Sequence, residues 1–79
     1  MNLEETIINI ISETLGVEKN KISTTSNFFE DLNADKLEVV DLILKIQQAC
    51  KVDIGEENFG KIQTVADLIN LIEENSDEL

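Results

Sequence analysis

The sequence predicts an all-α fold: a small up-down four-helix bundle with three main helices, one short helix and a long first loop. Apolar residues recur at helical spacing in three segments, and no segment alternates between apolar and polar residues as a strand does. No proline, repeat or low-complexity linker divides the chain. Its 79 residues suffice for one core, so we expect a single domain over residues 1–79, with residues 74–79 as a frayed tail.

The first helix is expected to begin at Asn2 and to end at Gly16. Asn2 stands three residues before Glu5, a spacing in which the Asn side chain accepts from free backbone N–H groups while the Glu side chain reaches back. Apolar residues then follow on one helical face: Leu3, Ile7, Ile10, Ile11 and Leu15. Gly16 can end the helix in the left-handed conformation that other residues resist.

A long polar connection over residues 17–34 follows the first helix. Its residues at 19–21 and 23–27 prefer turns and caps to helix interiors. Five apolar side chains are expected to hold it against the core: Val17, Ile22, Phe28, Phe29 and Leu32. A loop of this length is unusual in a compact domain unless it anchors itself to the core or carries function.

The second helix is expected to begin at the cap residue Asp35, with Glu38 three residues on. We predict that its inward stripe runs through Leu37, Val40, Ile43 and Leu44, flanked by Val39, Leu42 and Ile46. The exposed face is then expected to carry Glu38, Asp41, Lys45 and Gln48.

Two further helical segments are expected in the last third of the chain. A short helix or turn is predicted around residues 56–61, bracketed by Gly55 and Gly60. Thr64 and Asp67 form a weaker capping pair for a last helix. The inward face of that helix is expected to consist of Val65, Leu68, Ile69 and Ile72.

The charge balance points to a basic protein surface as the partner. There are 17 acidic and 6 basic residues, a net charge of −11, which argues against nucleic acid and anionic membranes. Self-repulsion at this charge favours a monomer. No apolar run approaches the roughly 20 residues that span a bilayer, so we expect no membrane insertion. Without a basic secretory start we expect the cytoplasm, or an organelle if a targeting segment has been removed.

Neither catalysis nor a metal site is expected. The chain has no histidine and one cysteine, Cys50, which excludes an internal disulfide and a Cys/His zinc site. Cys50 is expected to be a small core residue near a helix end. No nucleophile with an adjacent base can be assembled, so the chain is predicted not to be an enzyme.

A calcium site is considered because Asp31, Asn33 and Asp35 reproduce the oxygen-ligand spacing that opens an EF-hand loop. The sixth position of that loop requires glycine and is Lys36 here. The twelfth requires a bidentate Glu and is Leu42. We therefore expect no metal centre, although weak surface binding of divalent ions by the acidic residues is an open alternative.

The stretch FFEDLNADKLEVVDL, from Phe28 to Leu42, resembles the signature of acyl carrier proteins, in which an acidic turn leads to Asp-Ser-Leu at the start of the second helix. The acidic stretch at residues 53–57 and the sequence KIQTVADL at residues 61–68 also fit. The resemblance covers roughly residues 3–75. It favours a freestanding carrier of the fatty-acid-synthesis type, with polyketide synthesis left open.

The resemblance implies a carrier whose second helix is recognised by partners. In the family, a serine carries 4′-phosphopantetheine, whose thiol holds acyl chains as thioesters. The implied partners are a phosphopantetheinyl transferase and fatty-acid-synthesis enzymes with basic patches. Partner recognition is then expected at Glu30, Asp31, Asp35, Leu37, Glu38, Val40, Asp41, Glu56 and Glu57. Candidate lining for an acyl chain consists of Val39, Leu42, Ile43, Ile54, Ile62 and Leu68, with plain core packing as the alternative for each.

Lys36 stands where the resemblance requires the serine. A lysine has no hydroxyl, so no phosphodiester can form there, and no prosthetic group is expected on this chain. Its cation also lies at the positive end of the helix dipole, which is mildly unfavourable. Two explanations stay open: an engineered Ser→Lys block, or a natural relative that has lost the carrier role. The alternative function is accordingly a carrier-like structural or adaptor subunit that binds a larger assembly without a prosthetic group.

Overall fold

A computed structural model describes residues 2–76 of the chain, which form three α-helices and two short 3₁₀-helices. These are α1 (Leu3–Leu15), η1 (Lys19–Lys21), α2 (Lys36–Cys50), η2 (Glu56–Lys61) and α3 (Val65–Glu74). Within residues 2–76 there is no strand, only an isolated antiparallel bridge between Asn27 and Thr64. The predicted small all-α bundle is confirmed. The helical turn η1 inside the long connection was not predicted.

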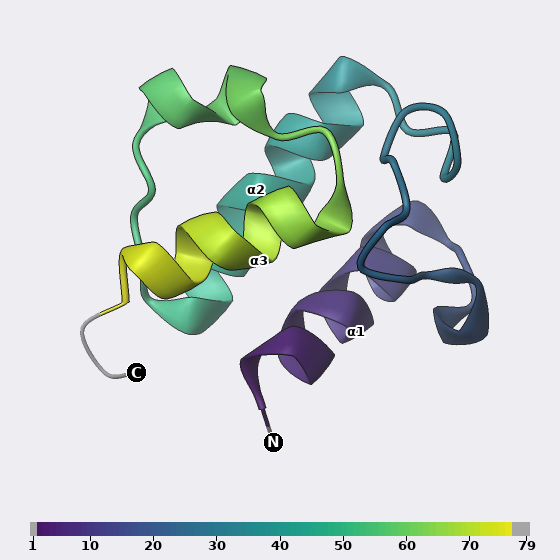
Figure 1. The fold of residues 1–79 in the computed structure, drawn as a ribbon, viewed down its shortest axis with the longest axis horizontal. Coiled ribbons are helices and arrows are strands. Elements are labelled where there is room, and N and C mark those ends of the chain that lie inside the picture. Colours follow the sequence, from purple (N-terminus) through teal and green to yellow (C-terminus); the bar gives the residue numbers. More distant parts are fainter. Residues whose placement is uncertain (1, 77–79) are drawn as a thin grey trace.

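The chain reverses direction between α1 and α2, and an arch that contains η2 then carries it back (Figure 1). As a result α3 runs in the same direction as α2 (Figure 1). Each α-helix packs against the other two. None of the helices over residues 2–76 is both long and apolar enough to cross a membrane. The expected frayed tail falls partly on residues 77–79, which lie outside the described residues.

The helices begin at the residues that the capping patterns predict. Asn2 Oδ1 accepts from the N–H of Glu5 at 2.7 Å, and Gly16 ends α1 at φ 68°. At α2 a full capping box forms: Asp35 Oδ1 accepts from the N–H of Glu38 at 2.8 Å, and Glu38 Oε1 accepts from the N–H of Asp35 at 2.9 Å. The start of α2 is therefore set by local hydrogen bonds.

The start of α3 carries a second capping box. Thr64 Oγ1 accepts from the N–H of Asp67 at 3.2 Å, and Asp67 Oδ2 accepts from the N–H of Thr64 at 3.0 Å. Asp67 Oδ2 also accepts from the N–H of Gln63 at 3.0 Å. The pair that was predicted to be the weaker cap thus accepts hydrogen bonds from three backbone N–H groups at this helix start.

We expect Asp67→Ala to lower the free energy of unfolding at neutral pH by about 0.5–2 kcal/mol. Burial alone would raise the pKa of the Asp67 carboxyl, but hydrogen bonds from the N–H groups of Gln63 and Thr64 and from the Thr64 side chain outweigh it and lower that pKa. The lowered pKa means that the ionised carboxylate stabilises the fold above its unfolded pKa of about 3.9. That contribution is lost as pH falls through the folded pKa.

Urea unfolding of the two proteins between neutral pH and pH of about 2 checks this pH dependence. The stability difference between wild type and Asp67→Ala should shrink on the acid side. Glu73→Ala, which removes an exposed carboxylate from the other end of α3, is the matched control and should not reproduce the effect. A difference that stays constant down to the lowest pH would contradict the stabilising role of the charge.

The core combines residues from the three α-helices, the long connection and the η2 arch. Within residues 2–76, the seventeen buried apolar residues are Ile7, Ile11, Ile22, Phe28, Leu32, Ala34, Val39, Leu42, Ile43, Ile46, Val52, Ile54, Ile62, Val65, Leu68, Ile69 and Ile72. The inward face predicted for α3 is confirmed in full. Cys50, at the end of α2, packs against this core.

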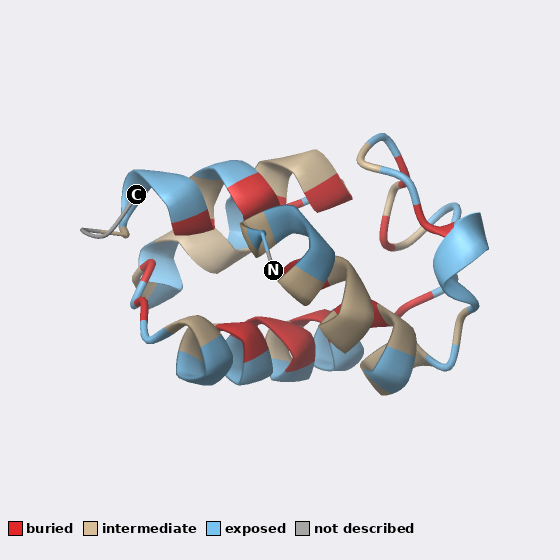
Figure 2. Cartoon of the chain, turned by 90° about the horizontal axis from the view of Figure 1, so that it is seen from below, coloured by how far each residue is buried: buried red, intermediate tan, exposed pale blue. Residues whose placement is uncertain are grey.

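The inward face predicted for α2 was wrong in part. Leu37 is 81% exposed and Leu44 is 51% exposed, whereas Ile43 is buried. The three residues that were expected only to flank the inward stripe are also buried: Val39, Leu42 and Ile46. Figure 2 shows the buried side of α2 turned toward the other helices. Leu37 and Leu44 are seven residues apart and share one face, so they mimic a core stripe in sequence. Packing of α1 and α3 on the other face decides which stripe is buried.

The long connection is anchored to the core and to the start of α3, as expected. The N–H of Phe28 donates to the carbonyl of Gln63 at 2.9 Å, and the N–H of Val65 donates to the carbonyl of Ser26 at 3.0 Å. The N–H of Ala34 donates to the carbonyl of Phe28 at 2.9 Å, which folds the segment back just before α2. These bonds position the beginning of α2 relative to the η2 arch and α3.

Candidate functional site

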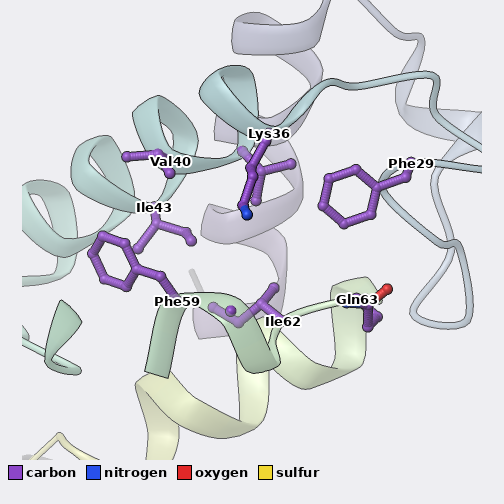
Figure 3. Close-up of a pocket in the computed structure, with 9 residues that line it drawn as sticks. Phe29, Lys36, Val40, Ile43, Phe59, Ile62 and Gln63 are labelled. Carbon is purple, nitrogen blue, oxygen red and sulfur yellow. The ribbon is translucent and has the colours of Figure 1, made fainter. Parts of the chain in front are cut away.

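A cavity of about 510 Å³ opens beside the start of α2. It lies between the long connection, α2 and the η2 arch (Figure 3). Its lining residues are Phe29, Lys36, Val39, Val40, Ile43, Phe59, Gly60, Ile62 and Gln63. The walls are mainly aliphatic and aromatic, so the cavity is suited to an apolar group.

Lys36 is the first residue of α2 and follows the cap residue Asp35 directly. Its side chain is exposed at the mouth of the cavity, and Figure 3 shows the ammonium nitrogen reaching into the space between Phe29, Ile43 and Ile62. The capping box on either side of Lys36 is complete. The lysine therefore occupies the expected attachment position without disturbing the helix start.

The residues expected to line an acyl site divide into two groups. Val39, Ile43 and Ile62 line the cavity. Leu42, Ile54 and Leu68 are buried in the core but are not among its lining residues. Helical geometry explains the difference within α2, because Leu42 projects about 100° away from Ile43.

Sequence reasoning missed several lining residues. Phe29 and Phe59 form aromatic walls from the connection and from η2, and Gly60 and Gln63 complete the rim. Val40, expected at the partner surface, also lines the cavity and is half-buried. The one available signal was that Phe29 and Phe59 are two of only three aromatic residues in the chain. Their convergence depends on the path of η2, which spacing within a helix does not reveal.

The acidic residues expected at the partner surface are all exposed. They are Glu30 and Asp31 in the connection, Asp35, Glu38 and Asp41 at α2, and Glu56 and Glu57 in η2. Exposed Leu37 lies on the same helix as Glu38 and Asp41. Asp41 also pairs with Lys45 at 3.3 Å. The expected recognition residues around α2 thus combine exposed carboxylates with the exposed side chain of Leu37.

Several of these carboxylates also support the local fold. Asp31 Oδ2 accepts from the N–H of Asn27 at 2.7 Å, and Asp35 and Glu38 are held by the capping box. Asn33 adopts φ 57°, a left-handed turn conformation that asparagine tolerates. The three residues with EF-hand-like spacing, Asp31, Asn33 and Asp35, therefore stabilise backbone turns and the start of α2. Across residues 2–76, no group of three or more His, Cys, Asp or Glu side chains is placed to hold a metal ion.

Cys50 is poorly suited to nucleophilic chemistry. It is half-buried at the end of α2, and burial raises the pKa of its thiol. The reactive thiolate is therefore scarce at neutral pH. The chain has no histidine that could activate the thiol.

Hydroxyl groups in the long connection and before α3 are engaged in the fold. Ser23 Oγ lies 2.9 Å from Thr25 Oγ1, and Ser26 is buried with its Oγ accepting from the N–H of Ser23 at 3.0 Å. Thr64 Oγ1 caps α3. Neither of these two segments places a hydroxyl at the start of α2, where the cavity opens.

A family model described as a phosphopantetheine attachment site matches residues 5–72. The match spans most of α1, the long connection, α2, η2 and most of α3, and so includes Lys36 and the cavity. Domains of this family are carriers without catalytic activity of their own, and their cofactor is 4′-phosphopantetheine. This chain belongs to the phosphopantetheine attachment site family of carrier domains.

Proposed function

We propose that this chain is an acyl carrier domain of the fatty-acid-synthesis type in a form that cannot be loaded, because Lys36 occupies the attachment position. One observation carries the proposal: the capped start of α2, with its signature residues and the adjoining apolar cavity, is complete except for the side chain at position 36. The residues present do not fit covalent attachment, since a phosphodiester requires a hydroxyl. The single domain over residues 1–79 is part of the same proposal.

Partner enzymes are expected to bind the acidic surface around α2 through basic patches. The net charge of −11 steers a basic partner toward the domain, and the exposed carboxylates along α2 set the orientation. Each exposed charge pair contributes about 0.2–1 kcal/mol and weakens as salt screens it. Leu37, with 81% of its surface exposed, supplies apolar contact area beside these charges. We also propose that the chain is a monomer in the cytoplasm.

A second candidate is a structural or adaptor subunit that uses the same surface but never receives an arm. The observation in its favour is that Lys36 is accommodated without loss of the capping box. The codon for position 36 in the source genome separates the two, since a serine codon would identify an engineered block.

We expect a Lys36→Ser version, incubated with coenzyme A and a phosphopantetheinyl transferase, to gain one phosphopantetheine arm, whereas the lysine form gains none. Intact mass spectrometry measures both. Lys36→Ala is the control that removes the ammonium without adding a hydroxyl, and it should stay unmodified. Modification of neither version would move the adaptor function ahead, and modification of the lysine form would place attachment elsewhere.

The rate of modification also tests the acidic surface. In the Lys36→Ser background, Asp41→Asn should slow the transferase about two- to fivefold at low salt. Glu13→Gln makes the same charge change on exposed α1 and is the matched control. Equal rates for the two variants, or a rate that does not fall as salt rises, would show that the acidic surface is not the recognition surface.

A further inference from the structure

We infer that Lys36 makes the cavity at the start of α2 a reversible binding site for a free medium-chain carboxylate. The apolar chain would lie in the cavity and the carboxylate would pair with the Lys36 ammonium. This inference builds on the proposed function in one respect, the absence of a covalent arm at position 36. It assigns a ligand to Lys36, the same side chain that prevents loading.

The tail would be held by the cavity walls. Six of the nine lining residues are aliphatic or aromatic, and at about 510 Å³ the cavity falls within the range of roughly 300–1,000 Å³ typical of small-molecule sites. Phe29 and Phe59 line the cavity from different segments, with Ile43 beside Phe59 and Ile62 between the two rings (Figure 3). An unbranched chain suits this lining, because nearly every wall residue offers apolar contact.

The head would be held by Lys36, which is the one ionisable residue among the described residues that line the cavity. Its ammonium projects into the cavity in Figure 3. The ion pairs found over residues 2–76 involve Lys21 with Glu18 and Lys45 with Asp41, so Lys36 has no carboxylate partner there. The positive end of the α2 dipole adds to the attraction for an anion at this position.

Two carboxylates oppose an anionic head, namely Asp35 and Glu38. Both carboxylates are turned to the helix start, where each accepts a hydrogen bond from the backbone N–H of the other residue, with N···O distances of 2.8 and 2.9 Å. Without the lysine, these charges and the net negative charge of the chain would repel a carboxylate from the cavity mouth. The ligand's negative charge should therefore favour binding only while Lys36 is present.

Titration of the unmodified chain with decanoate below its micelle concentration, and with decanol below its solubility limit, tests the inference by calorimetry and by amide shifts of the lining residues. We expect decanoate to bind, and Lys36→Met to weaken it about three- to tenfold while leaving decanol affinity unchanged. Lys45→Met removes a cation from the same helix outside the cavity and should leave both affinities nearly unchanged.

Chain length and cavity volume provide a second measurement. From hexanoate to decanoate, affinity should rise up to about fourfold for each added methylene until the cavity is full. Val40→Phe, which places a larger side chain in the lining, should weaken decanoate at least about tenfold, with far-UV circular dichroism confirming that α2 is retained.

Three results would overturn the inference. The first is that decanoate does not bind below its micelle concentration. The second is that decanoate binds the wild type and Lys36→Met with equal affinity. The third is that affinity keeps rising with chain length and is unchanged by Val40→Phe. The loading experiment on Lys36→Ser does not depend on free carboxylate. Failure of this inference is therefore distinguishable from failure of the proposed function.

Discussion

Phe28→Ala is expected to lower the free energy of unfolding by about 3–5 kcal/mol, because it removes a fully buried aromatic ring and leaves a cavity. A chain of 79 residues has a total stability of only about 4–12 kcal/mol. The backbone of Phe28 also links the connection to the carbonyl of Gln63 and to the N–H of Ala34. The loss of packing should therefore loosen the segment that positions α2.

Urea unfolding followed by far-UV circular dichroism measures this loss. Phe29→Ala is the matched control: the same residue type is removed one position away, but Phe29 is only partly buried and lines the open cavity. We expect a clearly smaller loss at Phe29. Equal losses at the two positions would contradict the assignment of Phe28 to the core and Phe29 to the site.

Leu42→Ala is expected to cost about 2–5 kcal/mol, whereas Leu44→Ala should change stability by no more than about 0.5 kcal/mol. Leu42 is fully buried against the core, and Leu44 is 51% exposed. The two leucines lie two residues apart on the same helix, so helix propensity changes equally in both variants. The comparison isolates burial as the cause.

Thermal and urea unfolding of the two variants decide which face of α2 is buried. A large loss of unfolding free energy for Leu44→Ala with little loss for Leu42→Ala would instead support the inward face that the sequence predicted for α2. The expected ranking would leave Leu37 and Leu44 as exposed apolar residues on α2, available to partners. The transferase assay described above can then test their contribution to recognition.

The local signals in the sequence predicted the helix starts well, because a cap acts through bonds between residues three positions apart. Asn2, Asp35 and Thr64 each accept from the N–H three residues on. The position of Lys36 at the start of α2 followed from the same pattern. The family assignment also rested on contiguous residues, and the family match over residues 5–72 confirms it at the level of a phosphopantetheine carrier domain.

The cavity was only partly predictable, because its walls come from segments distant in sequence. Three of the six expected lining residues, Val39, Ile43 and Ile62, line it. Phe29 and Phe59 were missed, since their approach to α2 requires the folded connection and the η2 arch. No spacing rule within one helix relates residue 29 to residue 59.

By itself, the sequence determined the helical class of this protein, the capped starts of its helices, its acidic character and the absence of a hydroxyl at position 36. These properties depend on composition and on contacts within a few residues. Only the tertiary structure decided which of two apolar stripes of α2 is buried and that Lys36 borders an apolar cavity. Both depend on how α1, α3, η2 and the long connection pack around α2, and a helical period alone cannot distinguish the face that other segments will cover.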